Sequence, residues 1–97
     1  MGTVVPSRAE VIASLLNTVT EVQTASGRPV DGLNESTGIY DGIDGFDSLN
    51  ALELLVMVGA TLGNEFPEQL LAPAAGTSSL TLGVLADRIL ARLEGKI

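Results

Sequence analysis

The chain contains no histidine and no cysteine, and each absence excludes a kind of chemistry. Without histidine, no side chain has an ordinary pKa near neutrality to activate a serine or to act as a general base. Without cysteine there are no disulfides, no thiol chemistry and no ordinary zinc site. We therefore predict that the protein is not an enzyme acting alone and holds no metal of its own.

Aromatic and basic residues are also scarce. Only three of the 97 residues are aromatic, so the core must be built from the aliphatic side chains within the 45% apolar share. Five basic residues stand against twelve acidic ones, and the net charge of −7 argues against nucleic-acid binding, which needs clustered Lys and Arg. The length predicts a single domain over 1–97.

No targeting or membrane signal stands out. The first six residues lack the basic flank and the apolar stretch of a signal peptide. The longest apolar run, 54–62, is far shorter than the about 20 residues that a membrane span requires. We expect a cytoplasmic monomer without membrane insertion.

The acidic residues gather in the middle of the chain. No base lies between Asp31 and Glu68, and all five bases fall outside that segment. Such a field of one sign attracts basic partners, although acids also simply keep a small domain soluble.

Helical periodicity and capping signals predict an all-α fold. Ser7 and Glu10 have the spacing of a capping box, and Thr81 is placed to cap the last helix. We predict a small four-helix bundle, with three long helices and one short one, over roughly 7–25, 47–62, 67–71 and 81–95.

Two segments between these helices are expected to be loops. The segment Arg28–Phe46 is rich in glycine, and a loop of this length is commonly functional when it is ordered. Leu33, Ile39 and Ile43 are the side chains expected to pin it to the core. The second loop, Pro73–Ser79, consists largely of small residues, and we expect flexibility in both.

The second predicted helix is apolar on two sides. At 100° per residue, its core stripe comprises Ala51, Leu54, Leu55, Val58 and Leu62. The opposite side carries Leu49, Glu53, Val56 and Ala60, with Leu52 at its margin. A central helix buried on both sides would look the same, but few helices are present to cover it, so the pattern favours a docking surface.

An Asp-Ser pair stands where the long loop meets this helix, in the segment Gly45-Phe46-Asp47-Ser48-Leu49. Taken alone, the pair indicates only a helix N-cap. Further downstream, Glu53-Leu54, Phe66-Pro67 and Thr81-Leu82-x-x-Leu85-x-x-x-Ile89 follow in order. This ordered set resembles an acyl carrier protein, and the resemblance covers most of the chain from Ser7 to Leu93.

The resemblance implies a carrier function. Ser48 would receive 4'-phosphopantetheine from coenzyme A through a separate phosphopantetheinyl transferase, and Asp47 would help that enzyme to hold its metal and coenzyme A. The thiol of the attached group would carry an acyl or aminoacyl intermediate from an acyl-loading enzyme to downstream synthase or transferase enzymes.

The sequence also departs from the family pattern. Gly59-Ala60-Thr61 stands where the family usually has acids, and Asn50 stands where Asp is frequent. We therefore expect partners to dock mainly on Leu49, Leu52 and Val56, with a modest electrostatic contribution from Asp44 and Glu53. These departures favour a specialised polyketide, peptide-type or lipid-modifying pathway over housekeeping fatty-acid synthesis.

Two other interpretations stay open. A helical bundle could bind partners through the apolar face of the second helix without ever carrying a cofactor. The acid-rich segment 41–47 suggests calcium, but no frame there has the register of an EF-hand, which leaves at most a weak metal site.

Overall fold

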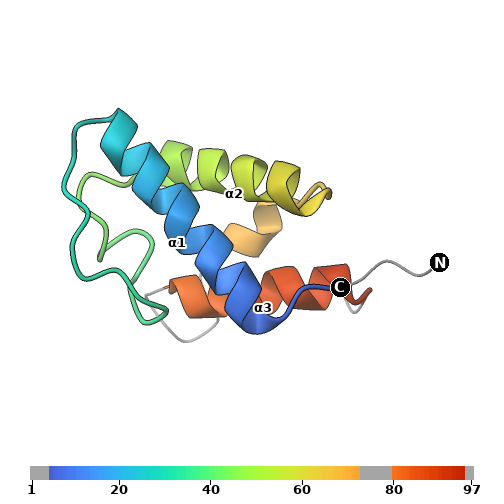
Figure 1. The fold of residues 1–97 in the computed structure, drawn as a ribbon. Coiled ribbons are helices and arrows are strands. Elements are labelled where there is room, and N and C mark those ends of the chain that lie inside the picture. Colours follow the sequence, from blue (N-terminus) through green and yellow to red (C-terminus); the bar gives the residue numbers. More distant parts are fainter. Residues whose placement is uncertain (1–4, 73–79, 96–97) are drawn as a thin grey trace.

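The computed structural model describes residues 5–72 and 80–95, and these residues confirm the all-helical prediction (Figure 1). The elements, in chain order, are α1 (Arg8–Ala25), α2 (Ser48–Leu62), the 3₁₀ turn η1 (Glu68–Leu71) and α3 (Leu82–Leu93). Within the described ranges there is no strand, only an isolated antiparallel bridge between Gly38 and Thr81.

The helices begin at the predicted caps. Ser7 Oγ accepts the Glu10 N–H at 3.2 Å, and the Ser7 N–H donates to Glu10 Oε1 at 3.3 Å, which completes the capping box. Thr81 Oγ1 accepts the Val84 N–H at 3.1 Å at the start of α3. Gly63, with φ of 69°, ends α2 in the left-handed conformation that glycine adopts at little cost.

Two boundaries differ from the prediction. The predicted short helix 67–71 is a single 3₁₀ turn of four residues, so the described residues contain three α-helices rather than four. The backbone returns to an extended conformation at Ala72 (ψ 140°), before a second turn could form. The last helix, predicted to end at residue 95, ends at Leu93 because the chain reaches a left-handed conformation at Gly95 (φ 78°).

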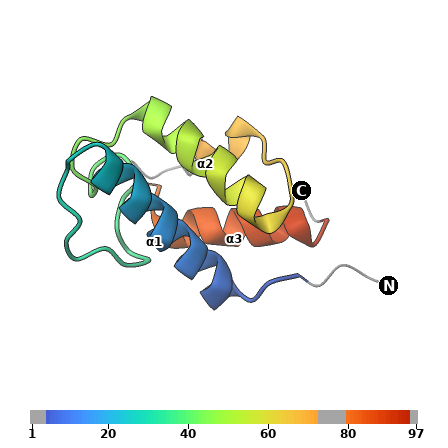
Figure 2. The same ribbon diagram turned by 45° about the horizontal axis from the view of Figure 1, so that its top comes forward.

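The first helix is the centre of the packing. Figure 1 shows α1 crossing α3 and η1 lying between α2 and α3, and Figure 2 shows α1 running beside α2. Val11, Leu15 and Val19 of α1 are fully buried, as the periodicity predicts. The aliphatic core continues with residues from the loop and the other helices, including Ile39, Leu54, Leu55, Val58, Leu80, Leu82, Leu85 and Ile89.

The long loop is pinned to the core, as predicted. Ile39 and Ile43 are buried and Leu33 is half-buried against the core cluster. Backbone hydrogen bonds also tie the loop to the start of α3, because the Ile39 N–H donates to the Leu80 carbonyl at 2.8 Å and the Leu82 N–H donates to the Thr37 carbonyl at 3.0 Å. The other predicted loop, Pro73–Ser79, lies outside the described residues.

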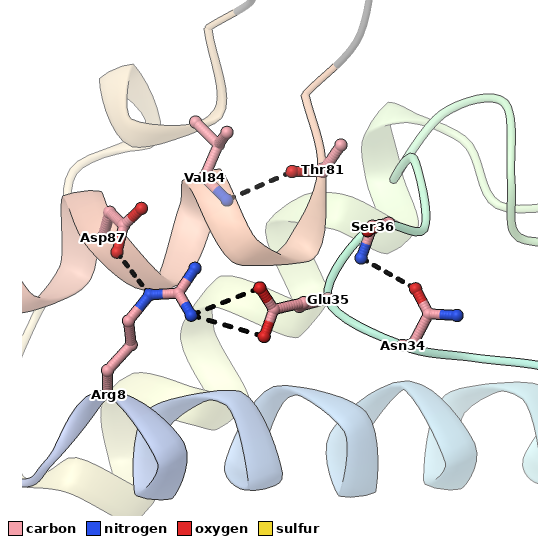
Figure 3. A network of polar contacts seen from close by, with 7 residues as sticks. All are labelled: Arg8, Asn34, Glu35, Ser36, Thr81, Val84 and Asp87. Carbon is pink, nitrogen blue, oxygen red and sulfur yellow. Dashed lines mark hydrogen bonds and ion pairs between the residues drawn. The ribbon is translucent and has the colours of Figure 1, made fainter.

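An arginine fastens this part of the loop from α1 (Figure 3). Arg8 Nε donates to Asp87 Oδ1 of α3 at 2.7 Å, and Nη1 donates to both carboxylate oxygens of Glu35 at 3.3 Å. The hydrogen bond to Asp87 is the main cause of the raised pKa of Arg8. Gly83 permits this approach, since a Cβ there would lie 3.0 Å from the Glu35 carbonyl oxygen and 3.1 Å from Arg8 Nη2.

Candidate functional site

Ser48 is the first residue of α2, and it is exposed. The capping of this helix uses its neighbours instead: Asp47 Oδ1 accepts the Asn50 N–H at 2.9 Å, and Asn50 Oδ1 accepts the Asp47 N–H at 3.3 Å. The Ser48 hydroxyl has no hydrogen-bond partner among the residues that the structure describes. Asp47 therefore has the capping role that its sequence position predicts, while the Ser48 oxygen takes no part in the cap.

Ser48 lies at the edge of an open cleft of about 370 Å³ between the long loop, α2 and η1. Tyr40, Leu52 and Leu71 contribute its apolar lining, and Glu68 of η1 also borders it. The Tyr40 hydroxyl donates to the Leu71 carbonyl oxygen at 3.4 Å, which connects the loop to η1. Tyr40 is 41% exposed, and its partial burial raises the pKa of the hydroxyl above the ordinary tyrosine value.

A polar network lies behind the Asp47–Ser48 turn, and sequence reasoning missed it. Gln23 of α1 is fully buried, and its Nε2 donates to the carbonyl oxygens of Asp44 at 2.7 Å and Pro29 at 3.4 Å. Gln23 Oε1 accepts from Arg28 Nε at 3.1 Å, and Arg28 Nη2 donates to Asn50 Oδ1 at 3.3 Å. Every polar atom of the glutamine is thus satisfied in the interior, as buried amides require.

One signal for this network was present in the sequence. Gln23 stands four residues after Val19, so it continues the apolar stripe of α1 as a polar residue on a buried face. Nothing in the local sequence marked its partners, which come from the loop.

The predicted partner-contact residues are spread over the outer surface beside Ser48. Leu49 and Val56 are 73% and 71% exposed, and Glu53 lies between them on the same helical face. Asp44 is exposed on the loop, whereas Leu52 is half-buried and lines the cleft. The predicted exposure of the outer face of α2 is confirmed, and the binding of partners there stays a prediction.

The departure from the family pattern at Gly59 has a structural reason. The chain turns back after α2, and the Asn64 N–H donates to the Gly59 carbonyl at 2.8 Å. A Cβ on Gly59 would lie 2.5 Å from the Asn64 carbonyl oxygen, which leaves no room for an acidic side chain.

The acidic loop was also a candidate for metal binding. Within residues 5–72 and 80–95, no three acidic side chains converge in a group that could hold a metal ion. Of the helices in the same ranges, none has the length and the hydrophobicity that crossing a membrane would take.

Comparisons with family models, with curated proteins and with solved structures gave no match for this chain. The residues of the site and the resemblance in sequence pattern are therefore what supports a function for this chain.

Proposed function

We propose that this protein is an acyl carrier protein of the cytoplasm, in which Ser48 accepts 4'-phosphopantetheine. The observation that carries the proposal is the accessibility of the Ser48 side chain. Its hydroxyl is exposed at the first turn of α2, next to the Asp47 carboxylate and at the edge of an apolar-lined cleft. An acceptor for a bulky group needs this accessibility, and a serine that only capped the helix would use its oxygen for the cap.

In the proposed transfer, Ser48 is the acceptor and not the catalyst. A bond forms between Ser48 Oγ and the phosphorus that carries pantetheine in coenzyme A, while the bond from that phosphorus to the nucleotide breaks and 3',5'-ADP leaves. The hydroxyl proton passes to a base of the transferase, since this chain has no histidine to take it. Asp47 caps α2 through Oδ1 and would present its charge to the metal of the transferase.

Once attached, the group would supply a thiol that carries an acyl or aminoacyl chain as a thioester. The cleft beside Ser48 fits this role because Tyr40, Leu52 and Leu71 offer it apolar walls. Partner enzymes would dock on the outer face of α2, where Leu49 and Val56 are exposed, with Asp44 and Glu53 adding modest electrostatic attraction. We place the protein in a specialised polyketide, peptide-type or lipid-modifying pathway, on the departures at Asn50 and Gly59.

Intact mass tests the proposal. The folded protein is incubated with coenzyme A, Mg²⁺ and a promiscuous phosphopantetheinyl transferase, and we expect a gain of one phosphopantetheine. Ser48→Ala should gain nothing, whereas Ser36→Ala, which changes another exposed serine in the adjoining loop, should gain as much as the parent. Modification of Ser48→Ala, or no gain in the parent with two transferases of different specificity, would contradict the carrier role.

Asp47→Asn separates the two roles of Asp47. Asparagine caps helices about as well as aspartate, so the helix should keep its stability. If the carboxylate assists the transfer, modification of this variant should be slower at an unchanged melting temperature.

The exposure of Leu49 and Val56 also favours a second candidate, a bundle that binds partners without carrying a cofactor. In that case Ser48→Ala would keep its full biological function, while Val56→Asp would lose it. The mass experiment and this pair of variants together distinguish the two functions.

A further inference from the structure

A basic side chain reaches the site from outside the acidic segment. Arg28 precedes that segment in sequence, and its guanidinium donates to Asn50 Oδ1 in the first turn of α2. Its side chain passes closely over Gly45, where a Cβ would lie 2.5 Å from Arg28 Cδ. Arg28 therefore lies across the loop immediately before the Asp47–Ser48 turn.

The orientation of this guanidinium is set by a buried group. Gln23 Oε1 accepts from Arg28 Nε at 3.1 Å, and the Gln23 carbonyl accepts the Arg28 backbone N–H at 2.9 Å. Gln23 is itself fully buried and bonded to the Asp44 and Pro29 carbonyls, so it cannot follow Arg28 if the arginine moves. The planar fork of the guanidinium then directs Nη2 toward α2.

The hydrogen bonds of this network reach Asp47 and Asn50, which flank Ser48 in the sequence. The Asn50 oxygen that accepts from Arg28 also accepts the Asp47 N–H, and the Asn50 N–H donates to Asp47 Oδ1. We infer that Arg28 is a positioning residue, which holds Asn50 and through it the Asp47–Ser48 turn in the geometry that the transferase recognises. This inference rests on the proposed function, and it assigns Arg28 no contact with coenzyme A.

The kinetics of phosphopantetheine transfer test this role. Without Arg28 the turn would be competent for only a fraction of the time, so Arg28→Ala should raise the KM for the carrier about fivefold while kcat stays within about twofold. Arg28→Lys keeps the charge but lacks the planar fork, so it should resemble Arg28→Ala. Arg92→Ala removes a charge from an exposed position on α3 and should leave KM within about twofold of the parent.

A second variant tests whether Arg28 acts through Asn50. If it does, the KM of Asn50→Ala should not rise further when Arg28→Ala is added, because the shared contact is already lost. Two effects that multiply would overturn the inference. Full rescue by Arg28→Lys would overturn it as well, since Arg28 would then contribute only its charge.

Hydrogen exchange provides a measurement that needs no transferase. Amides over residues 43–51 should exchange faster in Arg28→Ala and Arg28→Lys, while those over 82–93 keep the rates of the parent. If these amides exchange faster in the variants but the parent accepts no phosphopantetheine, the proposed function fails, while Arg28 still holds the Asp47–Ser48 turn in place. Unchanged exchange over 43–51 in both variants would overturn the positioning role. If Arg28→Ala proves unfolded by circular dichroism, Arg28→Lys carries the same comparison.

Discussion

Two arginines near opposite ends of α1 connect the long loop to the helices that follow it, and they do so by different means. Arg8 pairs with the carboxylates of Glu35 and Asp87 at the surface, and its side chain is 43% exposed. Arg28 is half-buried and donates to two neutral amide oxygens, those of Gln23 and Asn50.

Arg8 has charged partners and Arg28 has neutral ones, yet we expect the contacts of Arg8 to stabilise the fold less than those of Arg28. Exposed ion pairs are screened by water and salt and stabilise proteins little, even when the distances are short. The amide contacts of Arg28 depend on a buried glutamine, whose loss would remove the partner of the Asp44 and Pro29 carbonyls and of Arg28 Nε. We infer that the amides of Gln23 and Asn50 hold the end of the loop next to Ser48, whereas backbone hydrogen bonds mainly hold the end next to α3.

The largest effect should come from the buried amide. Gln23→Leu keeps the approximate volume but leaves two carbonyl groups and the Arg28 Nε without partners, so we expect a loss of about 3 kcal/mol in the free energy of unfolding. Urea denaturation measures this. Gln69→Leu, which changes the other glutamine at an exposed position, is the control and should change stability little. Equal losses of stability in the two variants would contradict the conclusion that the contacts of Gln23 hold this end of the loop.

Glycine variants should give an intermediate effect. Gly45 and Gly32 have similar positive φ values, 70° and 65°, so alanine at either should cost about 1–2 kcal/mol of stability from backbone strain. Only at Gly45 would the new Cβ also meet Arg28, since nothing lies within 4 Å of the corresponding atom at Gly32. We expect Gly45→Ala to be the more destabilising by about 1 kcal/mol. This difference in stability should disappear when each glycine variant is combined with Arg28→Ala. If it persists, the close contact with Arg28 is not its cause.

The surface ion pairs should give the smallest effect. Arg8→Ala should shift the urea midpoint less than Arg28→Ala does, and its shift should vanish at about 1 M NaCl, where charges at the surface are screened. The shift caused by Arg28→Ala should persist at the same salt concentration, because its acceptors are uncharged. A salt-independent effect of Arg8→Ala would mean that packing of its aliphatic stem matters more than its charge.

The parts of this structure that the sequence predicts are the local ones. The start of α1 depends on Ser7 and Glu10, three residues apart, and the end of α2 depends on Gly63, so short-range chemistry decides both. The exposed face of α2 was predictable for the same reason, because Leu49, Glu53 and Val56 share one side of any helix through them.

The parts that escape prediction join distant segments. Gln23 and Asp44 are 21 residues apart, and no local pattern specifies that the side chain of one meets the carbonyl of the other. The close approach of Gly83 to Glu35 likewise exists only once the loop has folded onto α3. At the candidate site, the motif predicts roles for Ser48 and Asp47, and these roles stay predictions, whereas no local pattern points to Tyr40 in the cleft or to Arg28 behind the turn.

Tyr40 is the only tyrosine in a chain without tryptophan, and it lies in the cleft next to Ser48. Its absorbance and fluorescence therefore report on one place in the molecule, with no label and no competing signal. Because burial raises its pKa, the alkaline absorbance change should fall above the ordinary tyrosine value of about 10. The protein thus contains an intrinsic optical probe. If Ser48 carries the proposed group, the emission of Tyr40 should change when that group enters or leaves the cleft.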